Sequence, residues 1–174
     1  TPKIALNIGD STVFADYVSG SGTDTLTFGY TIQAGDTDID GISIAANSLI
    51  LHDGTITDEA GNPADLAHGA LADNPDFMVD TTAPAAPVIN TVAGDNTINA
   101  AEQSTTITGT AQANATITLD IAGNLRTVTA DGSGNWSYTL TAADITAMGQ
   151  GAETISVTAT DAAGNTGTAG TRTI

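Results

Sequence analysis

The chain contains no cysteine, and this absence excludes several classes of site. Without thiols there is no disulfide, no thiolate zinc site and no cysteine nucleophile. The chain also lacks any run of about 18 apolar residues, so the sequence predicts no membrane-spanning helix. Neither a signal peptide nor a Met opens the sequence, which begins at Thr1, and we therefore expect a fragment of a longer protein.

Positive charge is almost as scarce. Lys and Arg together number 3 against 20 Asp and Glu, which gives a formal net charge of −17. A chain of this charge repels nucleic acid and anionic membrane surfaces, so we expect neither as a partner. Most of the acids are Asp, which favours turns and is also a hard oxygen ligand. The charge therefore indicates either simple solubility or the binding of a hard cation.

The residues of common active sites are missing as well. His52 and His68 stand alone, without a neighbouring nucleophile or a metal-ligand spacing. No Gly-x-Ser-x-Gly elbow and no phosphate-binding glycine loop occur. We predict no catalytic residue, and we expect a protein that is not an enzyme.

What the sequence does contain is a series of short strand patterns. Apolar and polar residues alternate, rich in Thr, Val and Ile, and Gly, Asn and Asp interrupt them every 8–12 residues or so. One helical turn is predicted over 141–151, with Thr141 as its N-cap. The pattern predicts an all-β protein built of antiparallel sandwiches, with strands over 25–33, 105–111, 115–123, 125–131, 135–141 and 153–161.

The stretch "VDTTAPAAPVIN" (79–90) divides the chain. Pro84 and Pro87 restrict the backbone to extended conformations, and a fresh series of strands begins after them. We interpret the stretch as a stiff joint between domains at 1–80 and 81–174. The alternative is that the prolines only interrupt an edge strand.

Two further observations favour two domains. "TDEAGNPA" (57–64) and "TDAAGNTG" (160–167) share Asp-x-Ala-Gly-Asn, each late in its half. Residues 1–80 carry a net charge of −12 and residues 81–174 one of −5. Trp136 is predicted to anchor the second core, with sugar stacking as the alternative, and the first core is expected to use five aromatic residues: Phe14, Tyr17, Phe28, Tyr30 and Phe77.

These segments resemble a known family. The stretch 79–90, "DGSGNWSYTL" (131–140) and "ISVTATDAAGNTG" (155–167) are similar to the bacterial Ig-like tandem repeats of giant secreted adhesins, of the RTX type or from biofilms. "LTFGYTIQAGDTDIDGISI" (26–44) resembles an extender repeat of the same proteins. The resemblance is weakest over 1–19 and 63–76.

The resemblance implies two tandem Ig-like antiparallel β-sandwiches joined end to end. In that family such repeats are stalk modules, exported by a type I system and stiffened by Ca²⁺ at their joints. It implies a secreted or cell-surface, monomeric chain whose partners are the neighbouring repeats.

"AGDTDIDGISI" (34–44) places Asp36, Asp38 and Asp40 at alternate positions before a glycine. This is how many calcium loops begin, since alternate oxygen ligands can curl around one ion. The EF-hand pattern fails at its twelfth position, which is Asn47. A calcium loop between strands is our prediction, and a solvated hairpin turn is the alternative.

A second calcium cluster is predicted at the joint. If the strands of the second domain run up and down, then Asp131, Asn135, Asp161 and Asn165 approach Asp80. Each of these loops is also an ordinary turn, which is the alternative interpretation. Asp58 lies in the matching motif of the first domain and is a further candidate. Three acids at the far end of the second domain are expected to serve a further joint instead: Asp95, Glu102 and Asp144.

Two functions fit this reading of the sequence. The first is a calcium-stiffened spacer that holds a distal binding domain of an adhesin away from the cell. The second is a ligand-binding module whose Thr-rich strands present a flat face to polysaccharide, host glycan or ice. Against the second, threonine alternates with core positions, and no long uninterrupted Thr-x-Thr ladder occurs.

Overall fold

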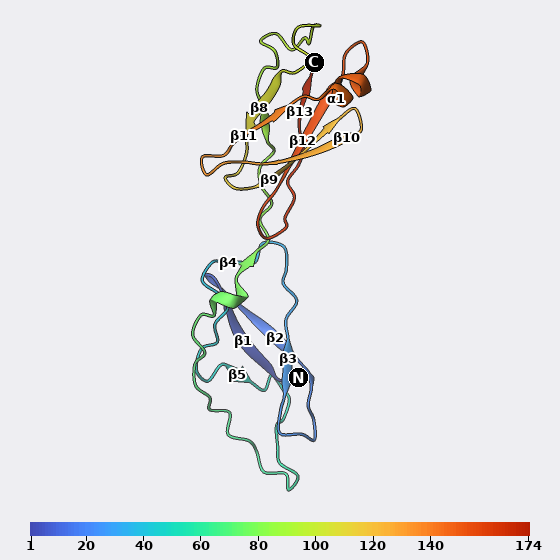
Figure 1. The fold of residues 1–174 in the computed structure, drawn as a ribbon. Coiled ribbons are helices and arrows are strands. Elements are labelled where there is room, and N and C mark those ends of the chain that lie inside the picture. Colours follow the sequence, from blue (N-terminus) through green and yellow to red (C-terminus); the bar gives the residue numbers. More distant parts are fainter. The chain divides into compact units, whose positions relative to one another are not determined.

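The computed structural model describes all residues, 1–174, and divides into two compact units, Thr1–Thr82 and Ala83–Ile174 (Figure 1). Each unit is described by itself. No helix in the structure combines the length and the apolar character that crossing a membrane requires.

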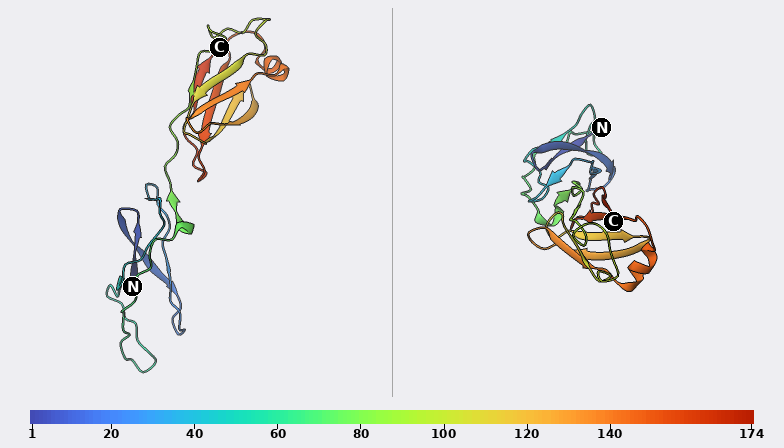
Figure 2. Two further views of the ribbon diagram at one scale, coloured as in Figure 1. Left: turned by 60° about the vertical axis from the view of Figure 1, so that its left-hand side comes forward. Right: turned by 90° about the horizontal axis from the view of Figure 1, so that it is seen from above.

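The second unit is an antiparallel sandwich. One sheet has the order β10-β9-β12-β13 and the other the order β11-β8-β7, and Figure 2 shows these two layers of strands. The strands are β7 (Val88–Ile89), β8 (Thr106–Thr110), β9 (Thr116–Ile121), β10 (Asn124–Thr129), β11 (Asn135–Thr139), β12 (Thr154–Thr160) and β13 (Gly170–Thr173).

The core of this sandwich follows from strict alternation along its central strands. In β9, Ile117, Leu119 and Ile121 are fully buried, and Thr118 and Asp120 alternate with them on the opposite face. Buried side chains of β8, β11 and β12 pack against them and complete the core. One of these is Trp136 in β11, which is only 3% exposed. The prediction that Trp136 anchors this core is confirmed, and its burial is incompatible with sugar stacking.

The single helix, α1 (Ala142–Met148), forms where the sequence predicts it. Thr141 caps the N-terminus, and its backbone and hydroxyl both donate to Asp144 in a capping box. The helix ends at Gly149, whose φ of 66° lies in the left-handed region that favours glycine.

Gly109 is the tightest point of the β8–β11 pair. It lies opposite Trp136 in the register, and a Cβ at this position would collide with the Val88 carbonyl oxygen and the Trp136 ring. We expect Gly109→Ala to lower the free energy of unfolding of the second unit by about 2–3 kcal/mol, because an overpacked core must shift backbone or ring. Urea denaturation followed by Trp136 fluorescence measures this. Gly132→Ala is the control, since a Cβ there meets open space, and an equal loss in both variants would contradict the steric explanation.

The first unit is built around one hairpin. β1 (Lys3–Ile8) and β2 (Ser11–Ser19) pair in register, and β3 (Thr27–Gly29) and β5 (Leu49–Ile50) extend the sheet to the order β3-β2-β1-β5. A separate two-stranded sheet contains β4 (Thr37–Asp38) and β6 (Val79–Asp80), preceded by the 3₁₀ turn η1 (Pro75–Phe77). Much of the remaining chain in this unit is irregular (Figure 1).

The strand expected over 25–33 is much shorter. A register shift between Tyr17 and Ser19 ends regular pairing, and β3 covers only residues 27–29. Beyond it the chain turns, so that the Tyr30 hydroxyl donates to the Asp36 carboxylate at 3.0 Å.

The expected aromatic core of the first unit is partly wrong. Tyr17 and Phe28 are half-buried and pack edge to face, with ring centroids 6.1 Å apart. Phe14 and Phe77 are 46% and 61% exposed, and Phe14 lies on the face of β2 opposite to the less exposed Val13, Ala15 and Tyr17. The buried apolar residues of this unit are only Ile8, Ala15 and Val79.

Candidate functional site

Asp38 is a buried carboxylate in the first unit, with 2% of its surface exposed. Its Oδ2 accepts from the Gly9 amide at 2.9 Å, and its Oδ1 accepts from the amides of Asp40 and Gly41 at 3.2 and 2.6 Å. The Gly9 amide is the main reason that the pKa of Asp38 lies below its ordinary value, and it outweighs the effect of burial. Asp38 is therefore held as an anion by backbone donors.

Asp40 has the opposite perturbation. Its side chain hydrogen-bonds the Asp38 carboxyl, and this bond, followed by burial and the negative charge of Asp73, raises the pKa of Asp40. Asp10, Asp38, Asp40 and Asp73 all line one cavity of ≈ 680 Å³. Carboxylates gathered in this way repel one another, and a bound cation would relieve the repulsion.

Asp36 does not belong to this cavity. Its Oδ2 accepts from the Tyr30 hydroxyl at 3.0 Å and from the Gln33 amide at 2.7 Å. Burial and the bond to Asp36 together raise the pKa of Tyr30. The structure thus pairs Asp38 with Asp40 and places Asp36 in a separate turn. Nowhere does it bring three or more His, Cys, Asp or Glu side chains together in a group that could hold a metal ion.

Asp73 and Asp10 were missed by the sequence reasoning. Asp73 lies in the segment 63–76, where the resemblance to adhesin repeats is weakest, and Asp10 sits in the turn between β1 and β2. Neither position belongs to an acidic motif, and only the approach of separate segments shows that they share a cavity.

Three of the four remaining Asp candidates, all except Asp80, occupy one recurring turn with the sequence Asp-x-x-Gly-Asn. In each copy the Asp amide donates to the Asn carbonyl, and the Gly amide donates to the Asp carbonyl. The Asn amide and side-chain amide then donate to the Asp carboxylate. The copies are Asp58–Asn62, Asp131–Asn135 and Asp161–Asn165.

These turns explain the electrostatics of the three carboxylates. The Asn62 side chain lowers the pKa of Asp58, the Asn135 amide that of Asp131, and the Asn165 side chain that of Asp161. The internal repeat in the sequence identifies two copies of the motif. The third copy, "DGSGN", was not identified because it lacks the shared Ala. Each Asp therefore has a structural role in its turn, as the acceptor of these bonds.

The register of the second unit places two of these turns at one end. Thr116 pairs with both Thr129 and Thr160, and Thr110 pairs with both Asn135 and Val88. Three loops next to these residues therefore lie at the same end of the unit as its first strand, as the up-and-down arrangement predicts. They are 111–115, 130–134 and 161–165.

The segment that enters the second unit is held at this same end. The Pro84 carbonyl lies against Gly167 and the Pro87 carbonyl against Gly170, so closely that a Cβ at either glycine would collide with them. No strand occurs between Asp80 and Val88. Asp80 itself lies in the first unit, where its Oδ1 accepts from the Thr82 amide at 2.9 Å.

Asp144, one of the three acids at the far end of the second unit, is buried. It is 0% exposed, and Arg126 pairs with it at 2.9 Å while the Tyr138 hydroxyl donates to it at 2.7 Å. Burial alone would raise the pKa of Asp144, but the bonds from Thr141, Tyr138 and Arg126 outweigh burial and hold the pKa far below its usual range. This carboxylate is satisfied within its own unit, so the expectation that it serves a neighbouring joint is wrong.

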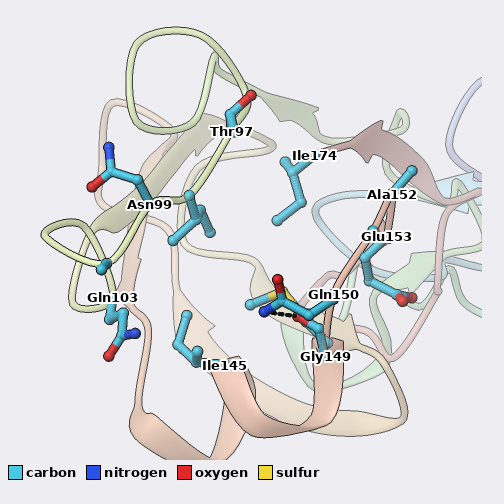
Figure 3. Close-up of a pocket in the computed structure, with 13 residues that line it drawn as sticks. Thr97, Asn99, Gln103, Ile145, Gly149, Gln150, Ala152, Glu153 and Ile174 are labelled. Carbon is cyan, nitrogen blue, oxygen red and sulfur yellow. Dashed lines mark hydrogen bonds between the residues drawn. The ribbon is translucent and has the colours of Figure 1, made fainter.

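The far end of the second unit carries an open cavity of ≈ 630 Å³ (Figure 3). Ile98, Ile145, Met148 and Ile174 give it an apolar lining, and Figure 3 shows Ile145 and Ile174 pointing into it. Glu153 is its only ionisable side chain. The cavity offers no pair of groups for acid–base or nucleophilic chemistry.

Comparison with known proteins gives a family match over part of the chain. Residues 83–174 match the sequence profile of the bacterial Ig domain. No curated protein matches the chain.

Several solved structures are similar to it. A bacterial immunoglobulin-like domain from the M. primoryensis ice-binding adhesin is 34% identical, over 53% of this chain and 96% of that one, with a TM-score of 0.42. A structure described as a Ca²⁺-stabilized adhesin that helps an Antarctic bacterium bind ice is 27% identical, over 99% of this chain and 39% of that one, with a TM-score of 0.47. A tetra-tandem repeat from the extending region of a large adhesion protein is 21% identical, over 99% of this chain and 40% of that one, with a TM-score of 0.41.

The chain thus spans well under two thirds of the length of the second and third of these structures. Every one of the TM-scores lies below 0.5, so the assignment to a family depends on the sequence match and on the sheets of the second unit. That match covers more than half of the chain, and the matched residues fold into two packed antiparallel sheets. The chain belongs to the bacterial Ig domain family.

Proposed function

We propose that this chain is a pair of calcium-stiffened spacer modules of a large bacterial surface adhesin. The observation that carries the proposal is the contrast between the cores of the two units. The first unit buries three apolar residues and the second thirteen. A domain of about 80 residues without a sufficient core needs disulfides, a metal or a partner, and this chain has no cysteine.

The cavity of the first unit supplies the chemistry that such a metal needs. Asp38, Asp40 and Asp73 would hold Ca²⁺ there, because Ca²⁺ prefers carboxylate and carbonyl oxygen and accepts irregular geometry. A bound Ca²⁺ supplies two positive charges, which would offset the repulsion among Asp38, Asp40 and Asp73 that helps to raise the pKa of Asp40. The side chains would have to turn toward one another, since they form no three-ligand group as they stand.

The Asp40→Asn variant tests this site, because we expect it to be more stable than the native chain without calcium and to gain less stability from calcium. Without calcium we expect the variant to melt higher than the native chain, because the repulsion from Asp38 and Asp73 is gone. With calcium we expect a smaller rise in melting temperature than the native chain shows, because one ligand charge is lost. Scanning calorimetry in EDTA and in calcium measures both. Asp24→Asn is the matched control, an exposed acid outside the cavity, and an unchanged calcium response in Asp40→Asn contradicts the assignment.

The joint is the second part of the proposal, with domains at 1–80 and 81–174 and a stiff connector between them. Asp80, Asp131, Asp161 and Asn165 are the proposed ligands, and Asp58 is a further candidate in the first domain. Support comes from the gathering of the 130–134 and 161–165 loops at the end where the connector enters, and from the packing of Pro84 and Pro87 against that end. Carboxylates that cap turns keep lone pairs for an ion.

The spacer function follows from the calcium concentration at which such sites bind the ion. Calcium modules of extracellular proteins bind at about 10⁻⁴–10⁻³ M, so they are empty inside a cell and filled outside it. The modules would be pliable during export and stiff on the cell surface, where they hold a distal binding domain. The setting is the surface of a bacterium, and the partners are neighbouring repeats of the same chain.

Alanine at Asp131 and Asp161 tests the joint. We expect the double variant to keep both units folded and to lose the calcium-dependent narrowing of its distance distribution in small-angle X-ray scattering. Asp120→Ala is the control, because Asp120 also caps a turn, from the opposite end of β9, through the Gly123 amide at 2.8 Å. If Asp120→Ala loses the narrowing as well, the effect comes from turn capping and the joint site is refuted.

One observation favours the ligand-binding alternative. On the outer face of the four-stranded sheet, Thr127, Thr118 and Thr158 are aligned across three strands, and the next row contains Thr129, Thr116 and Thr160. Such a grid could present hydroxyls to polysaccharide, glycan or ice. Retention on a glycan array or in growing ice would favour the alternative, and the absence of retention would favour the spacer.

A further inference from the structure

His68 is held by its ring and by its main chain in the first unit. Its Nε2 lies 2.9 Å from the Ser48 amide nitrogen and 3.3 Å from the Leu49 amide nitrogen. Its Nδ1 lies 2.8 Å from the Gly69 carbonyl oxygen. The ring thus joins the edge strand β5 to a segment about twenty residues further along the chain.

The partners of the ring determine its protonation. A backbone amide can only donate, so Nε2 must be an unprotonated acceptor toward Ser48 and Leu49. A carbonyl can only accept, so Nδ1 must carry the proton toward Gly69. The arrangement therefore requires the neutral ring in its Nδ1–H tautomer.

The surrounding main chain completes a clasp between residues 44–49 and 68–71, which we name the His68 clasp. The Asn47 amide donates to the His68 carbonyl at 3.2 Å, and the His68 amide donates to the Asn47 side chain at 3.1 Å. Ile44 and Leu71 exchange backbone bonds of 2.9 and 2.8 Å. The clasp fastens the irregular chain before η1 to the sheet, in a unit with few buried apolar contacts.

No nearby charge compensates a protonated ring. Residues 44–51 and 68–71 contain no acid or base other than His68 itself. Along its own segment the nearest acids are Asp65 and Asp73, and no ion pair joins the ring to a carboxylate. On β1, which pairs with β5, Lys3 is already paired with Asp16 at 2.9 Å.

We propose that the His68 clasp is sensitive to acid: it is closed when the imidazole is neutral and opens when the imidazole is protonated. Protonation makes Nε2 a donor that faces the amide donors of Ser48 and Leu49, so both amide bonds are lost together, and only the Ser48 hydroxyl, 3.4 Å from Nε2, is left as an acceptor. Imidazole gains its proton between about pH 8 and pH 5. The clasp requires the neutral ring, so acidification removes its stabilisation. Acid would loosen the first unit locally and leave the second unit unchanged.

Hydrogen exchange of the whole chain in calcium, at pH 7.5 and pH 5.0, tests the proposal. After correction for intrinsic exchange, we expect the protection factors of the Ser48 and Leu49 amides to fall about tenfold or more at the lower pH. His68→Gln removes this pH step, because an amide side chain does not titrate. His52→Gln keeps it, since the His52 ring makes none of these bonds. A pH step that survives His68→Gln would place the effect in the carboxylates and overturn the proposal.

The native chain alone provides a second test, which holds even if His68→Gln fails to fold. Nitrogen NMR distinguishes the two tautomers of a neutral imidazole. We expect the His68 ring to carry its proton on Nδ1 at pH 7.5 and to show Nε2 as the acceptor. A ring protonated on Nε2 at that pH would overturn the proposal directly.

Discussion

In EDTA we expect the first unit to melt about 10–20 °C lower than in about 10 mM calcium, while the second unit, which supplies ligands only at the joint, shifts by less. The size follows from linkage: a site with a dissociation constant near 10⁻⁴ M gains about 2.7 kcal/mol at a hundredfold excess of ligand. The asymmetry follows from the cores, because the fully buried side chains of β8, β9 and β12 hold the second unit without metal.

Scanning calorimetry of the whole chain checks this expectation. Trp136 lies in the second unit and is the only tryptophan, so its fluorescence follows that unit separately. The control is Mg²⁺, which demands stricter octahedral geometry and binds such irregular sites weakly. Equal stabilisation by both ions would indicate general charge screening, and a tryptophan transition that shifts as far as the transition of the first unit would contradict the assignment of the main effect to the first unit.

The second large effect is expected at the buried ion pair of the sandwich. Asp144→Ala should lower the free energy of unfolding of the second unit by about 3–5 kcal/mol, because Arg126 is left without its partner and the capping box of α1 is lost. Urea denaturation measures the loss. Asp120→Ala, an exposed acid that caps a turn through one bond, should cost about 1 kcal/mol or less.

The same residue predicts a dependence on pH. The pKa of Asp144 is lowered in the folded chain, so its stabilisation is complete above the ordinary carboxyl pKa of about 3.9 and is lost only as the pH falls through the lowered native value. The difference in stability between the native chain and Asp144→Asn should stay constant from pH 7 to pH 5 and shrink below pH 4. A difference that shrinks already near pH 6 would mean that another group is responsible.

The sequence predicts the second unit well, because local pattern and tertiary packing agree there. Alternating Ile and Leu in β9, the Thr141 cap of α1 and the burial of Trp136 all follow from period and residue type. The first unit has no such agreement. Phe14 and Phe77 are apolar and yet exposed, and residue type alone does not show which aromatic side chains the first unit buries.

The candidate site shows the same limit. Their alternate positions in the sequence placed Asp36, Asp38 and Asp40 in one predicted site. In the structure the chain turns after β3, and the Asp36 carboxylate accepts from the Tyr30 hydroxyl instead. Asp73 joins Asp38 and Asp40 from a distant segment, which no spacing rule can foresee. The Asp-x-x-Gly-Asn motif was visible, yet the sequence could not show that each Asp accepts hydrogen bonds from the Asn of its own turn.

The most direct test of the central claim is small-angle X-ray scattering of residues 1–174, in EDTA and then in millimolar calcium, with thermal melts on the same samples. A spacer stiffened by calcium predicts a longer and narrower distance distribution together with a higher melting temperature of the first unit. If calcium changes neither the distribution nor the melting temperature, the stiffening is refuted, and the connector with Pro84 and Pro87 acts without a metal.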